Sequence, residues 1–407
     1  MDRVILHCDM NNFFASVECK NDPSISSFPV AVCGNSEERH GIVLAKNYEA
    51  KKYGIKTGEP TVAAKAKCPF LVTVEPHYDE YAKYSHLARQ IYSEYTDLVE
   101  PFGDDECWLD VTGSGLLFGG GEKIADTVRK RIKKELGLTV SVGVSFNKVF
   151  SKLGSDMKKP DAVTVIKRSD FKEKIWHLDA SELIGVGPST SRTLKSFGIH
   201  TIGDLANAYP ELLRGKLGKN GIYLKEAANG REYSPVRPSN QGPPMKSIGH
   251  GMTTVTDLKT YSEIKSLILA LFEDVGHRLI QNGKKAGGVS VSLRDCNFFT
   301  RQCQKKLPVC TDSYSVMARE AYDIMKKKLP ISCPIRSVSV AAIDVTDASI
   351  PSQLDFFTDC SDVLKRERLD RVLDSINVRF GRGKAYYAGA YPDVSGKKAI
   401  GFGAGII

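Results

Sequence analysis

Three consecutive carboxylates, Asp104, Asp105 and Glu106, stand between two apolar stretches of the chain. Like charges this close repel, and each raises the pKa of its neighbours unless a cation lies between them. The apolar flanks predict a strand hairpin over residues 99–111, with the acids at its turn. Another acid, Asp9, ends a second apolar strand. Carboxylates at neighbouring strand ends suit Mg²⁺, and two such ions stabilise the attacking and leaving oxygens of phosphoryl transfer.

A solvated acidic turn is the alternative for these three residues, so the rest of the chain has to decide. The chain has 407 residues, which exceeds a single core and predicts roughly two to four domains. Its composition, 42% hydrophobic and 26% charged, is ordinary for a globular protein. No apolar run approaches the roughly 20 residues that span a bilayer, and no basic leader precedes the first strand. We therefore expect a cytoplasmic protein with no membrane association.

Cysteine usage and charge narrow the class further. The ten cysteines include no Cys-x-x-Cys pair, and no histidine pair accompanies Cys296, Cys303 and Cys310, so a zinc site is not expected. Reduced thiols are typical of an intracellular protein. The net charge is +9, and residues 231–350 hold 17 Lys and Arg against 11 Asp and Glu. A basic region beside an acidic, metal-type cluster is what an enzyme acting on nucleic acid requires.

The N-terminal half of the chain predicts a mixed α+β domain with an insertion. The expected elements are a strand over 3–9, a helix over 13–19, an amphipathic helix over 78–97, the hairpin, a helix over 121–136 and a strand over 138–144. Strand, helix, hairpin, helix and strand describe a split βαβ sheet. Residues 29–76 predict a small mixed unit. The apolar face of the 78–97 helix, which carries Tyr81, Tyr84 and Tyr95, is expected to be core and not a base-stacking platform.

The C-terminal half predicts two further modules. Residues 168–230 predict helices only. Prolines between 235 and 244 predict an extended linker and a domain boundary. The next elements again follow the order β-α-β-β-α-β, with a strand over 246–256, a helix over 260–281, strands over 287–296 and 299–309, a helix over 312–329 and a strand over 335–345. Residues 347–407 are Gly-rich, with a helix expected at about 361–379.

Several motifs would place phosphate-binding groups near the acids. A helix that begins after Asn12 would present free amide N–H groups, which bind phosphate. Phe13 and Phe14 follow, and an aromatic ring there can lie under a sugar and exclude a 2′-hydroxyl; burial of both rings in the core is the alternative. Tyr48 and Lys51 share a helix face and can grip a triphosphate, with solvated surface as the alternative.

A group of lysines follows the 138–144 strand. Lys148 and Lys152, close to Ser145, lie four residues apart, and Lys158 and Lys159 precede a proline. We interpret them as unpaired lysines near the catalytic strand, suited to a primer backbone or to terminal phosphates.

The sharpest local pattern lies in the helical region. Gly185 and Gly187 predict a tight hairpin, Pro188 fits the first turn of the next helix, Gly198 ends that helix, and Thr201 can cap another. This resembles a helix-hairpin-helix module, whose hairpin amides bind a DNA phosphate without reading sequence. An ordinary helical turn is the alternative.

A short peptide after the basic region suggests a partner. Gln353, Leu354, Phe356 and Phe357 resemble the Gln-Leu-x-Leu-Phe peptide by which DNA enzymes dock on the bacterial sliding clamp. Phe356 departs from the usual leucine but stays apolar. A chance match is the alternative for so short a peptide.

In this order, the motifs resemble the Y-family DNA polymerases, most closely the DinB-type polymerases, over roughly residues 1–380. The resemblance implies an α+β, multidomain right-hand polymerase. Its expected parts are a split βαβ palm at 1–20 and 78–167, small fingers at 21–77, a helical thumb with a helix-hairpin-helix at 168–231, a linker at 232–243, a DNA-gripping β-α-β-β-α-β little finger at 244–347, and a C-terminal tail at 348–407 that carries the clamp-binding-like peptide.

The same resemblance implies roles for individual residues. The catalytic acids would be Asp9, Asp105 and Glu106, which with the carbonyl of Met10 would hold two Mg²⁺ ions. Phe14 aligns with the aromatic that excludes ribonucleotides. The nucleotide-binding residues would be Asn12, Phe13, Phe14, Ala45, Tyr48, Lys51 and Lys159. The DNA-binding residues would be Ser145, Lys148, Lys152, Gly185, Gly187, Thr190, Lys246, Ser247, Arg294 and Arg336.

Three positions depart from the family pattern. Gly103-Asp104 stands where the family has Ser-Ile, and the isoleucine would face the core. The aspartate is therefore expected either to stay buried, at a cost of several kcal/mol, or to turn toward the metal ions. Lys51 stands where arginine is common and lacks its bidentate fork. Ala45 lacks a hydroxyl that many relatives carry.

The sequence thus predicts template-directed DNA synthesis by a monomer, with primer-template DNA, deoxynucleoside triphosphates and a sliding clamp as partners. No stretch is left over for a proofreading exonuclease, so the resemblance implies low-fidelity synthesis across damaged template. Two alternatives stay open. One is a non-enzymatic, clamp-recruited DNA-binding factor whose acidic site is spoiled by Asp104. The other is a nucleotide cyclase on a similar split sheet, which would not need the DNA-gripping modules.

Overall fold

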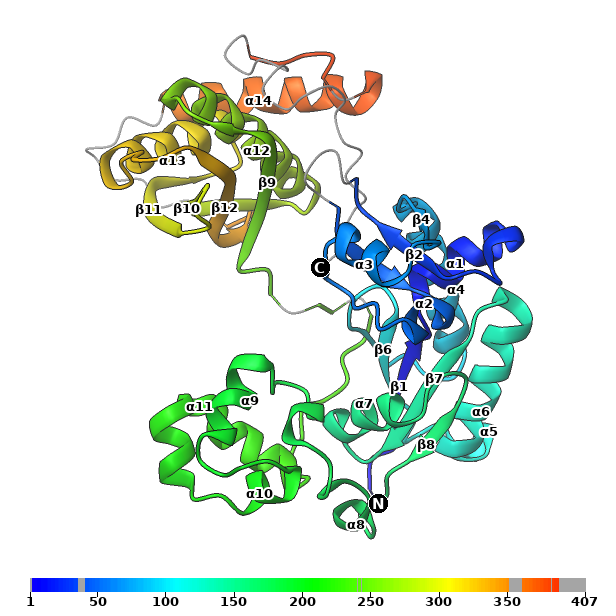
Figure 1. The fold of residues 1–407 in the computed structure, drawn as a ribbon. Coiled ribbons are helices and arrows are strands. Elements are labelled where there is room, and N and C mark those ends of the chain that lie inside the picture. Colours follow the sequence, from blue (N-terminus) through cyan, green and yellow to red (C-terminus); the bar gives the residue numbers. More distant parts are fainter. Residues whose placement is uncertain are drawn as a thin grey trace. The chain divides into compact units, whose positions relative to one another are not determined.

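The computed structural model describes residues 2–35, 41–239, 241–242, 244–350, 361–381 and 383–387. The chain divides into two compact units, with the boundary between Gly242 and Pro243. The first unit contains the expected palm, fingers and thumb, and the second contains the expected little finger (Figure 1). The boundary coincides with the proline-rich stretch from which the sequence predicted it.

A five-stranded sheet forms the centre of the palm. The strand order is β5 (Val99–Pro101), β6 (Glu106–Asp110), β1 (Ile5–Met10), β7 (Val140–Ser145) and β8 (Val163–Val165). The first strand, β1, is antiparallel to both β6 and β7, and every residue of it is buried. The expected split βαβ sheet is confirmed, with β8 as an additional strand parallel to β7.

Successive side chains of β1 point to opposite faces of the palm sheet, and the two faces have different surroundings. Leu6, Cys8 and Met10 belong to a core shared with helices on one side of the sheet. Those helices are α1 (Phe13–Asn21), α4 (Tyr78–Ser93) and α6 (Gly121–Arg131), which a π-turn extends over Ile132–Leu136; the short α5 (Gly115–Phe118) precedes α6. The other side is covered by α7 (Lys148–Met157), which contacts β1 and β7. Residues 7 and 9 therefore lie toward α7.

The aromatic face of α4 belongs to the core, as expected. Tyr81, Tyr84 and Ile91 of α4 are buried, as is Tyr95, which lies two residues beyond the end of the helix. Spacings of three and seven residues bring the three helical side chains to one stripe of α4. They therefore pack the palm and offer no stacking surface to bases.

The fingers form a small separate sheet with its own helices. The strands are in the order β3 (Val43–Lys46), β2 (Val30–Cys33) and β4 (Val72–Val74). The helices are α2 (Tyr48–Lys52) and α3 (Thr61–Lys67), with a 3-10 turn at Pro23–Ile25. Asn47 caps α2, since its side chain accepts a hydrogen bond from the amide of Ala50 at 2.9 Å. This cap fixes where β3 ends and where the helix carrying Tyr48 begins.

The thumb is helical throughout its regular elements, as the sequence predicts. It contains α8 (Phe171–Ile175), a 3-10 turn (Ala180–Glu182), α9 (Pro188–Lys195), α10 (Ile202–Asn207) and α11 (Pro210–Ala228). Thr201 and Asp204 form a reciprocal capping box at the start of α10. Gly185 (φ +92°) and Gly198 (φ +73°) adopt left-handed backbone conformations at the turns before and after α9.

The first half of the expected linker is bound to the palm. Glu232 and Val236 are buried, and the amide of Arg237 donates to Glu100 at 2.9 Å. Val236 packs with Ile5 and Trp108. The chain is therefore anchored as far as residue 237, several residues beyond the expected start of the linker.

The second unit has the expected element order on a four-stranded sheet. The elements are β9 (Ser247–Leu258), α12 (Tyr261–Gln281), β10 (Lys284–Asp295), β11 (Thr300–Thr311), α13 (Tyr314–Lys328) and β12 (Ile335–Asp347). The strand order is β11-β10-β12-β9, with all neighbours antiparallel. Helices α12 and α13 pack on one face of the sheet (Figure 1).

A helix of the expected tail belongs to this unit. Helix α14 (Ser361–Phe380) packs against α13 through polar contacts. Asp370 is fully buried and accepts hydrogen bonds from the Ser313 hydroxyl at 2.5 Å and from the Ser315 amide at 3.1 Å. The clamp-binding-like peptide, residues 353–357, lies outside the described residues, as do residues 388–407. Within the described residues, no helix is long and apolar enough to cross a membrane.

Candidate active site

Strand pairing brings the predicted acids together. Asp9 of β1 is directly opposite Glu106 of β6 in the antiparallel register. Asp105 precedes β6, and its carbonyl accepts a hydrogen bond from the amide of Met10 at 3.1 Å. The three acids therefore come from two adjacent strand ends, as the sequence predicted.

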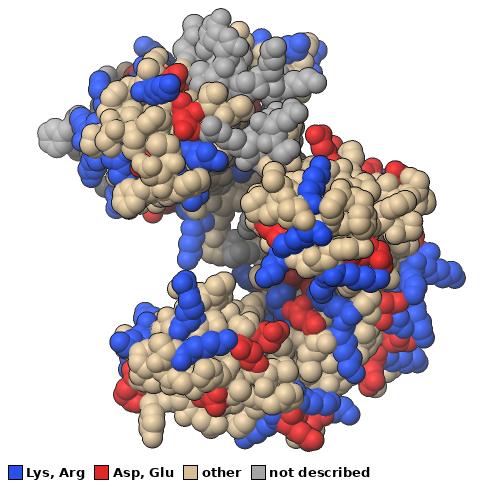
Figure 2. Space-filling view, in the orientation of Figure 1, with Lys and Arg blue, Asp and Glu red and all other residues tan. Residues whose placement is uncertain are grey.

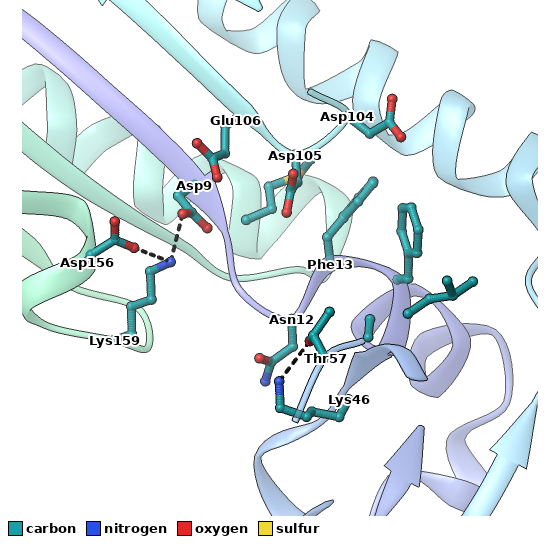
Figure 3. Close-up of a pocket in the computed structure, with 14 residues that line it drawn as sticks. Asp9, Asn12, Phe13, Lys46, Thr57, Asp104, Asp105, Glu106, Asp156 and Lys159 are labelled. Carbon is teal, nitrogen blue, oxygen red and sulfur yellow. Dashed lines mark hydrogen bonds and ion pairs between the residues drawn. The ribbon is translucent and has the colours of Figure 1, made fainter. Parts of the chain in front are cut away.

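The acids open onto a pocket of about 420 Å³ (Figure 3). Nine of the predicted metal and nucleotide residues line it, namely Asp9, Met10, Asn12, Phe13, Phe14, Ala45, Asp105, Glu106 and Lys159. Phe14 is half-buried and stacks on Tyr81 with ring centroids 4.1 Å apart. The pocket thus has carboxylates at one end and aromatic rings in its wall.

The protein shifts the pKa values of the three acids in different directions. Burial, together with the charges of Asp9 and Glu106, raises the pKa of Asp105 to about 7. Burial also raises the pKa of Asp9, although Lys159 opposes the shift. Burial alone would raise the pKa of Glu106, but hydrogen bonds with His7 and Lys152 outweigh it and lower the pKa to about 2.

Two lysines provide the counter-charges. Lys159 Nζ lies 2.7 Å from Asp9 Oδ2 and 2.9 Å from Asp156 Oδ1. Lys152 Nζ donates to Glu106 Oε2. Each ammonium group therefore neutralises one of the acids from the side of α7 or from the loop that follows it.

The acid set fits Mg²⁺ by chemistry but is not drawn into one coordination sphere. Carboxylate oxygens and a backbone carbonyl are the ligands that Mg²⁺ prefers. The pKa of Asp105 is raised first by burial and then by repulsion from Asp9 and Glu106, and a cation would relieve this repulsion. Within the described residues, however, no three His, Cys, Asp or Glu side chains are grouped closely enough to hold a metal ion. Lys159 and Lys152 hold Asp9 and Glu106 separately. The binding of two Mg²⁺ ions by these residues therefore stays a prediction.

Tyr48 and Lys51 of the fingers, which are predicted to bind the triphosphate, lie outside the pocket wall. Tyr48 and Lys51 share a face of α2, with Lys51 Nζ 5.8 Å from the Tyr48 ring, but neither lines the pocket. Burial raises the pKa of Tyr48, and the charges of Lys159 and Asp9 also act on it. Tyr48 therefore lies near the acidic end of the pocket without forming its wall.

Some pocket residues were missed from the sequence. Lys46 ends β3 and donates to Thr57 Oγ1 at 3.0 Å, and both line the pocket with Leu44 and Asp156. Lys46 ends a strand directly before the helix cap Asn47, and Asp156 lies three residues before Lys159. Both signals were present in the sequence.

Comparisons with known proteins show the family to which the chain belongs. The model of the impB/mucB/samB family matches residues 8–156, and the model of its C-terminal domain matches residues 245–356. DNA polymerase IV of Acetivibrio thermocellus is 51% identical over 94% of this chain and 96% of its own length. DNA polymerase IV 1 of Bacillus subtilis is 35% identical over 93% of this chain and 91% of its own length. The chain belongs to the impB/mucB/samB family.

The fold of the chain is that of a Y-family polymerase. The structure of a Y-family DNA polymerase chimera (Dbh-Dpo4(243-245)-Dbh) superposes with a TM-score of 0.74 at 24% identity. The superposition covers 84% of this chain and 99% of the chimera. The expected α+β architecture is thereby confirmed.

Asp104, which stands where the family has isoleucine, is neither fully buried nor directed at the other acids. Asp104 is half-buried, and its carboxylate points away from Asp105 and Glu106 (Figure 3). Helix α4 fixes the turn, because the Ser85 hydroxyl donates to the Asp104 carbonyl and Arg89 donates to the Gly103 carbonyl at 3.1 Å. The expected full burial is wrong, because Asp104 is half-buried and lines the pocket with the other acids. A turn toward metal ions stays a prediction.

The lysines expected to be unpaired are paired. Lys148 is only 9% exposed, and its Nζ lies 2.7 Å from Glu100 Oε1. Lys152 is paired with Glu106, and Ser145 is buried and donates to the Ile166 carbonyl at 2.9 Å. The interpretation of these lysines as unpaired was wrong, because acids distant in the sequence fold against them.

The other predicted DNA-binding residues lie at or near the surface. In the thumb, Gly185 and Gly187 are exposed and Thr190 is half-buried. Lys and Arg side chains project from the part of the thumb that carries α9 and α11 (Figure 2). In the second unit, Lys246, Ser247 and Arg294 are exposed and Arg336 is half-buried. DNA contact by these residues stays a prediction.

Proposed function

We propose that the chain is a template-directed DNA polymerase that extends a primer 3′ end with deoxynucleotides, at low fidelity and across damaged template. The observation that carries the proposal is the pocket in which three strand-end carboxylates face aromatic rings and a lysine. The split βαβ sheet and the relatives named DNA polymerase IV support it.

The acids and lysines have complementary tasks in this reaction. Asp9, Asp105, Glu106 and the Met10 carbonyl are the groups that would hold two Mg²⁺ ions, which supply a lowered pKa for the primer hydroxyl and charge neutralisation for the triphosphate. Lys159, now paired with Asp9 at 2.7 Å, is then free to turn its ammonium group to the triphosphate. Tyr48 and Lys51 extend this cationic wall from the fingers.

Phe14 is the proposed sugar gate. Its ring lines the pocket and stacks on Tyr81, so it presents a fixed steric wall. Replacing it with alanine should raise the ratio of ribonucleotide to deoxynucleotide incorporation by about 10-fold or more, since about 1.4 kcal/mol of steric exclusion corresponds to a factor of 10. An unchanged ratio would remove this role.

Two neighbouring acids provide a matched test of the active site. Asp105→Ala should reduce Mg²⁺-dependent primer extension by about 1000-fold or more, because a charge-stabilising group of the transition state is lost. Asp104→Ala, one residue away with its carboxylate pointing elsewhere, should stay within about threefold of the wild type. Both variants should bind primer-template DNA as the wild type does. Full extension by Asp105→Ala would refute the proposal, and a wild type that binds DNA without extending it would favour a DNA-binding factor.

The remaining partners are proposals of the same kind. Residues 353–357 are proposed to dock on a sliding clamp, and the chain is proposed to act as a cytoplasmic monomer. Deleting the peptide should abolish stimulation of extension by the clamp and leave clamp-free extension unchanged. Equal stimulation of both proteins would contradict clamp docking, and sedimentation of the free chain checks the monomer.

A further inference from the structure

Among the described residues, only one oxygen of the Glu106 carboxylate is held by other side chains. Lys152 Nζ donates to Oε2, and His7 Nε2 lies 3.2 Å from the same atom. In the part of the chain that the structure describes, no group donates to Oε1. Glu106 lines the pocket, so the carboxylate has one anchored oxygen and one oxygen available to a ligand.

His7 is fixed on all sides. It is fully buried on β1, two residues before Asp9 and on the same face of the sheet. Its ring packs edge-on against Trp108, with centroids 5.1 Å apart at 60°. Its Nδ1 lies 2.8 Å from the hydroxyl of Ser155 on α7, which is 1% exposed. The imidazole therefore bridges a buried hydroxyl and the Glu106 carboxylate.

Each nitrogen of the imidazole faces one polar neighbour. Nδ1 lies 2.8 Å from Ser155 Oγ, and Nε2 lies 3.2 Å from Glu106 Oε2. The Ser155 hydroxyl donates to the Lys152 carbonyl at 2.7 Å, so the serine is held on α7 beside the ring. The ring therefore fills the space between α7 and the Glu106 carboxylate.

Close packing of α7 on the sheet makes this arrangement possible. A Cβ at Gly143 of β7 would overlap the Ser151 carbonyl oxygen and lie 2.5 Å from the Ser155 amide nitrogen. Glycine at this position lets the helix approach the strand closely. Ser155 can therefore reach a side chain on the adjacent strand.

We propose that Ser155 and His7 are positioning residues, forming a relay of side-chain contacts that holds Glu106 with Oε1 facing the pocket. Ligating carboxylates are themselves oriented by outer hydrogen bonds, and losing such a partner typically reduces metal affinity or activity by about 10- to 100-fold. The inference rests on the proposed function, in which Glu106 binds a divalent ion. It adds two residues that touch neither metal nor substrate.

The test uses pairs of variants that differ in one contact. His7→Phe keeps a ring against Trp108 but loses both nitrogens, while His7→Gln retains an N–H donor and a carbonyl acceptor. Ser155→Ala is matched by Ser151→Ala, because both serines are buried on α7 and donate to the carbonyl three residues earlier, but only Ser155 touches His7. His77→Phe is a further control, since His77 contacts Glu18 at 3.0 Å outside the pocket.

The primary readout is Mn²⁺ binding, measured by electron paramagnetic resonance on the full chain with a dideoxy-terminated primer-template and a deoxynucleotide. The half-saturating Mn²⁺ concentration should rise about 10-fold or more for His7→Phe and about threefold to 10-fold for Ser155→Ala. His7→Gln should lie within about threefold of the wild type, and Ser151→Ala and His77→Phe should not change it. DNA affinity should be constant throughout.

The outcomes separate a positioning role from a structural one. A lower melting temperature of His7→Phe with unchanged Mn²⁺ binding would overturn the proposal, as would equal effects of the two serine variants. If His7→Phe does not fold, the serine pair and His7→Gln decide alone. A wild type that neither binds Mn²⁺ nor extends primers removes the proposed function itself. A wild type that does both while all variants match it removes only the relay.

Discussion

The palm sheet and the sheet of the second unit share one element order but place their first strand differently. In the palm, β1 lies in the middle, between β6 and β7, and all six of its residues are buried. In the second unit, β9 lies at the edge beside β12, and its burial alternates. The sequences differ accordingly, because β1 is apolar apart from His7 and Asp9 while β9 begins Ser-Ile-Gly-His-Gly-Met-Thr-Thr.

The position of the first strand decides what its polar residues can do. With helices on both sides of the palm sheet, a polar side chain on β1 needs a buried partner, and Asp9 and His7 have Lys159 and Ser155. In the second unit, α12 and α13 pack on one face, and alternate β11 residues such as Gln302, Gln304 and Lys306 are exposed. The palm sheet therefore contains a site between its own strands and α7, whereas the sheet of the second unit leaves a polar face exposed.

The largest difference should appear when a methyl group is added to a glycine in each sheet. Gly143→Ala would drive Cβ into the backbone of α7, whereas at Gly251 of β9 the overlap is with the Ser339 hydroxyl, a side chain on the open face. We expect a loss of about 3 kcal/mol or more in unfolding free energy for the first and less than about 1 kcal/mol for the second.

Tryptophan fluorescence can follow the unfolding of the first unit alone. Both tryptophans, Trp108 and Trp176, lie in that unit, so their fluorescence in a urea titration reports its unfolding. Calorimetry serves for Gly251→Ala. Equal losses at the two glycines would show that the open face is packed as tightly as the closed one.

A buried ion pair in the palm and an exposed pair in the second unit should respond differently to pH. Burial alone would raise the pKa of Glu100, but hydrogen bonds with Lys148 and Arg237 outweigh it and lower the pKa. A lowered carboxyl pKa stabilises the fold above the unfolded value, about 4.3, and this contribution is lost as pH falls through the folded value. Glu100→Gln should therefore reduce the unfolding free energy by about 2 kcal/mol at pH 7, and the difference should vanish in acid.

The control for Glu100 is Asp347 of β12. Hydrogen bonds from Ser349 and Lys284 lower the pKa of Asp347 to about 2, but the carboxylate is exposed and water and salt screen it. Asp347→Asn should thus change stability little at any pH in 0.15 M salt. Urea titrations between pH 3 and 8 check both variants. A constant difference for Glu100→Gln down to pH 3 would mean that its ion pair does not act through ionisation.

A feature could be predicted from the sequence when residues close together in the chain determine it. Alternation and turn signals are local. They predicted the hairpin with its acids, the first strand to within one residue of its end at Met10, the α10 cap at Thr201 and the glycine after α9. Asp9 and Glu106 met because two buried strands of known polarity leave little choice of register.

The rest was set by contacts distant in sequence. Lys148 is neutralised by Glu100 and Lys159 by Asp9, pairs 48 and 150 residues apart, so no local pattern indicates them. The direction of the Asp104 carboxylate depends on hydrogen bonds from α4 to the turn. The strand order of the second unit and the docking of α14 through Asp370 likewise required the packed structure.

The smallest predicted effect concerns DNA affinity and separates two residues that the sequence treated alike. Arg294 is exposed on β10 and, with Arg336, lies 5.0 Å from the exposed Phe298 ring, whereas Lys148 is buried against Glu100. Arg294→Gln should weaken primer-template binding about threefold to 10-fold and reduce the salt slope of log K by about one, because one phosphate contact is lost. Lys148→Gln should change neither the DNA affinity nor the salt slope, although it should destabilise the palm.

Fluorescence anisotropy between 50 and 200 mM salt distinguishes the two variants. A reduced slope for Lys148→Gln would mean that its ion pair opens to DNA, and the contrast between the closed and the open sheet would then fail.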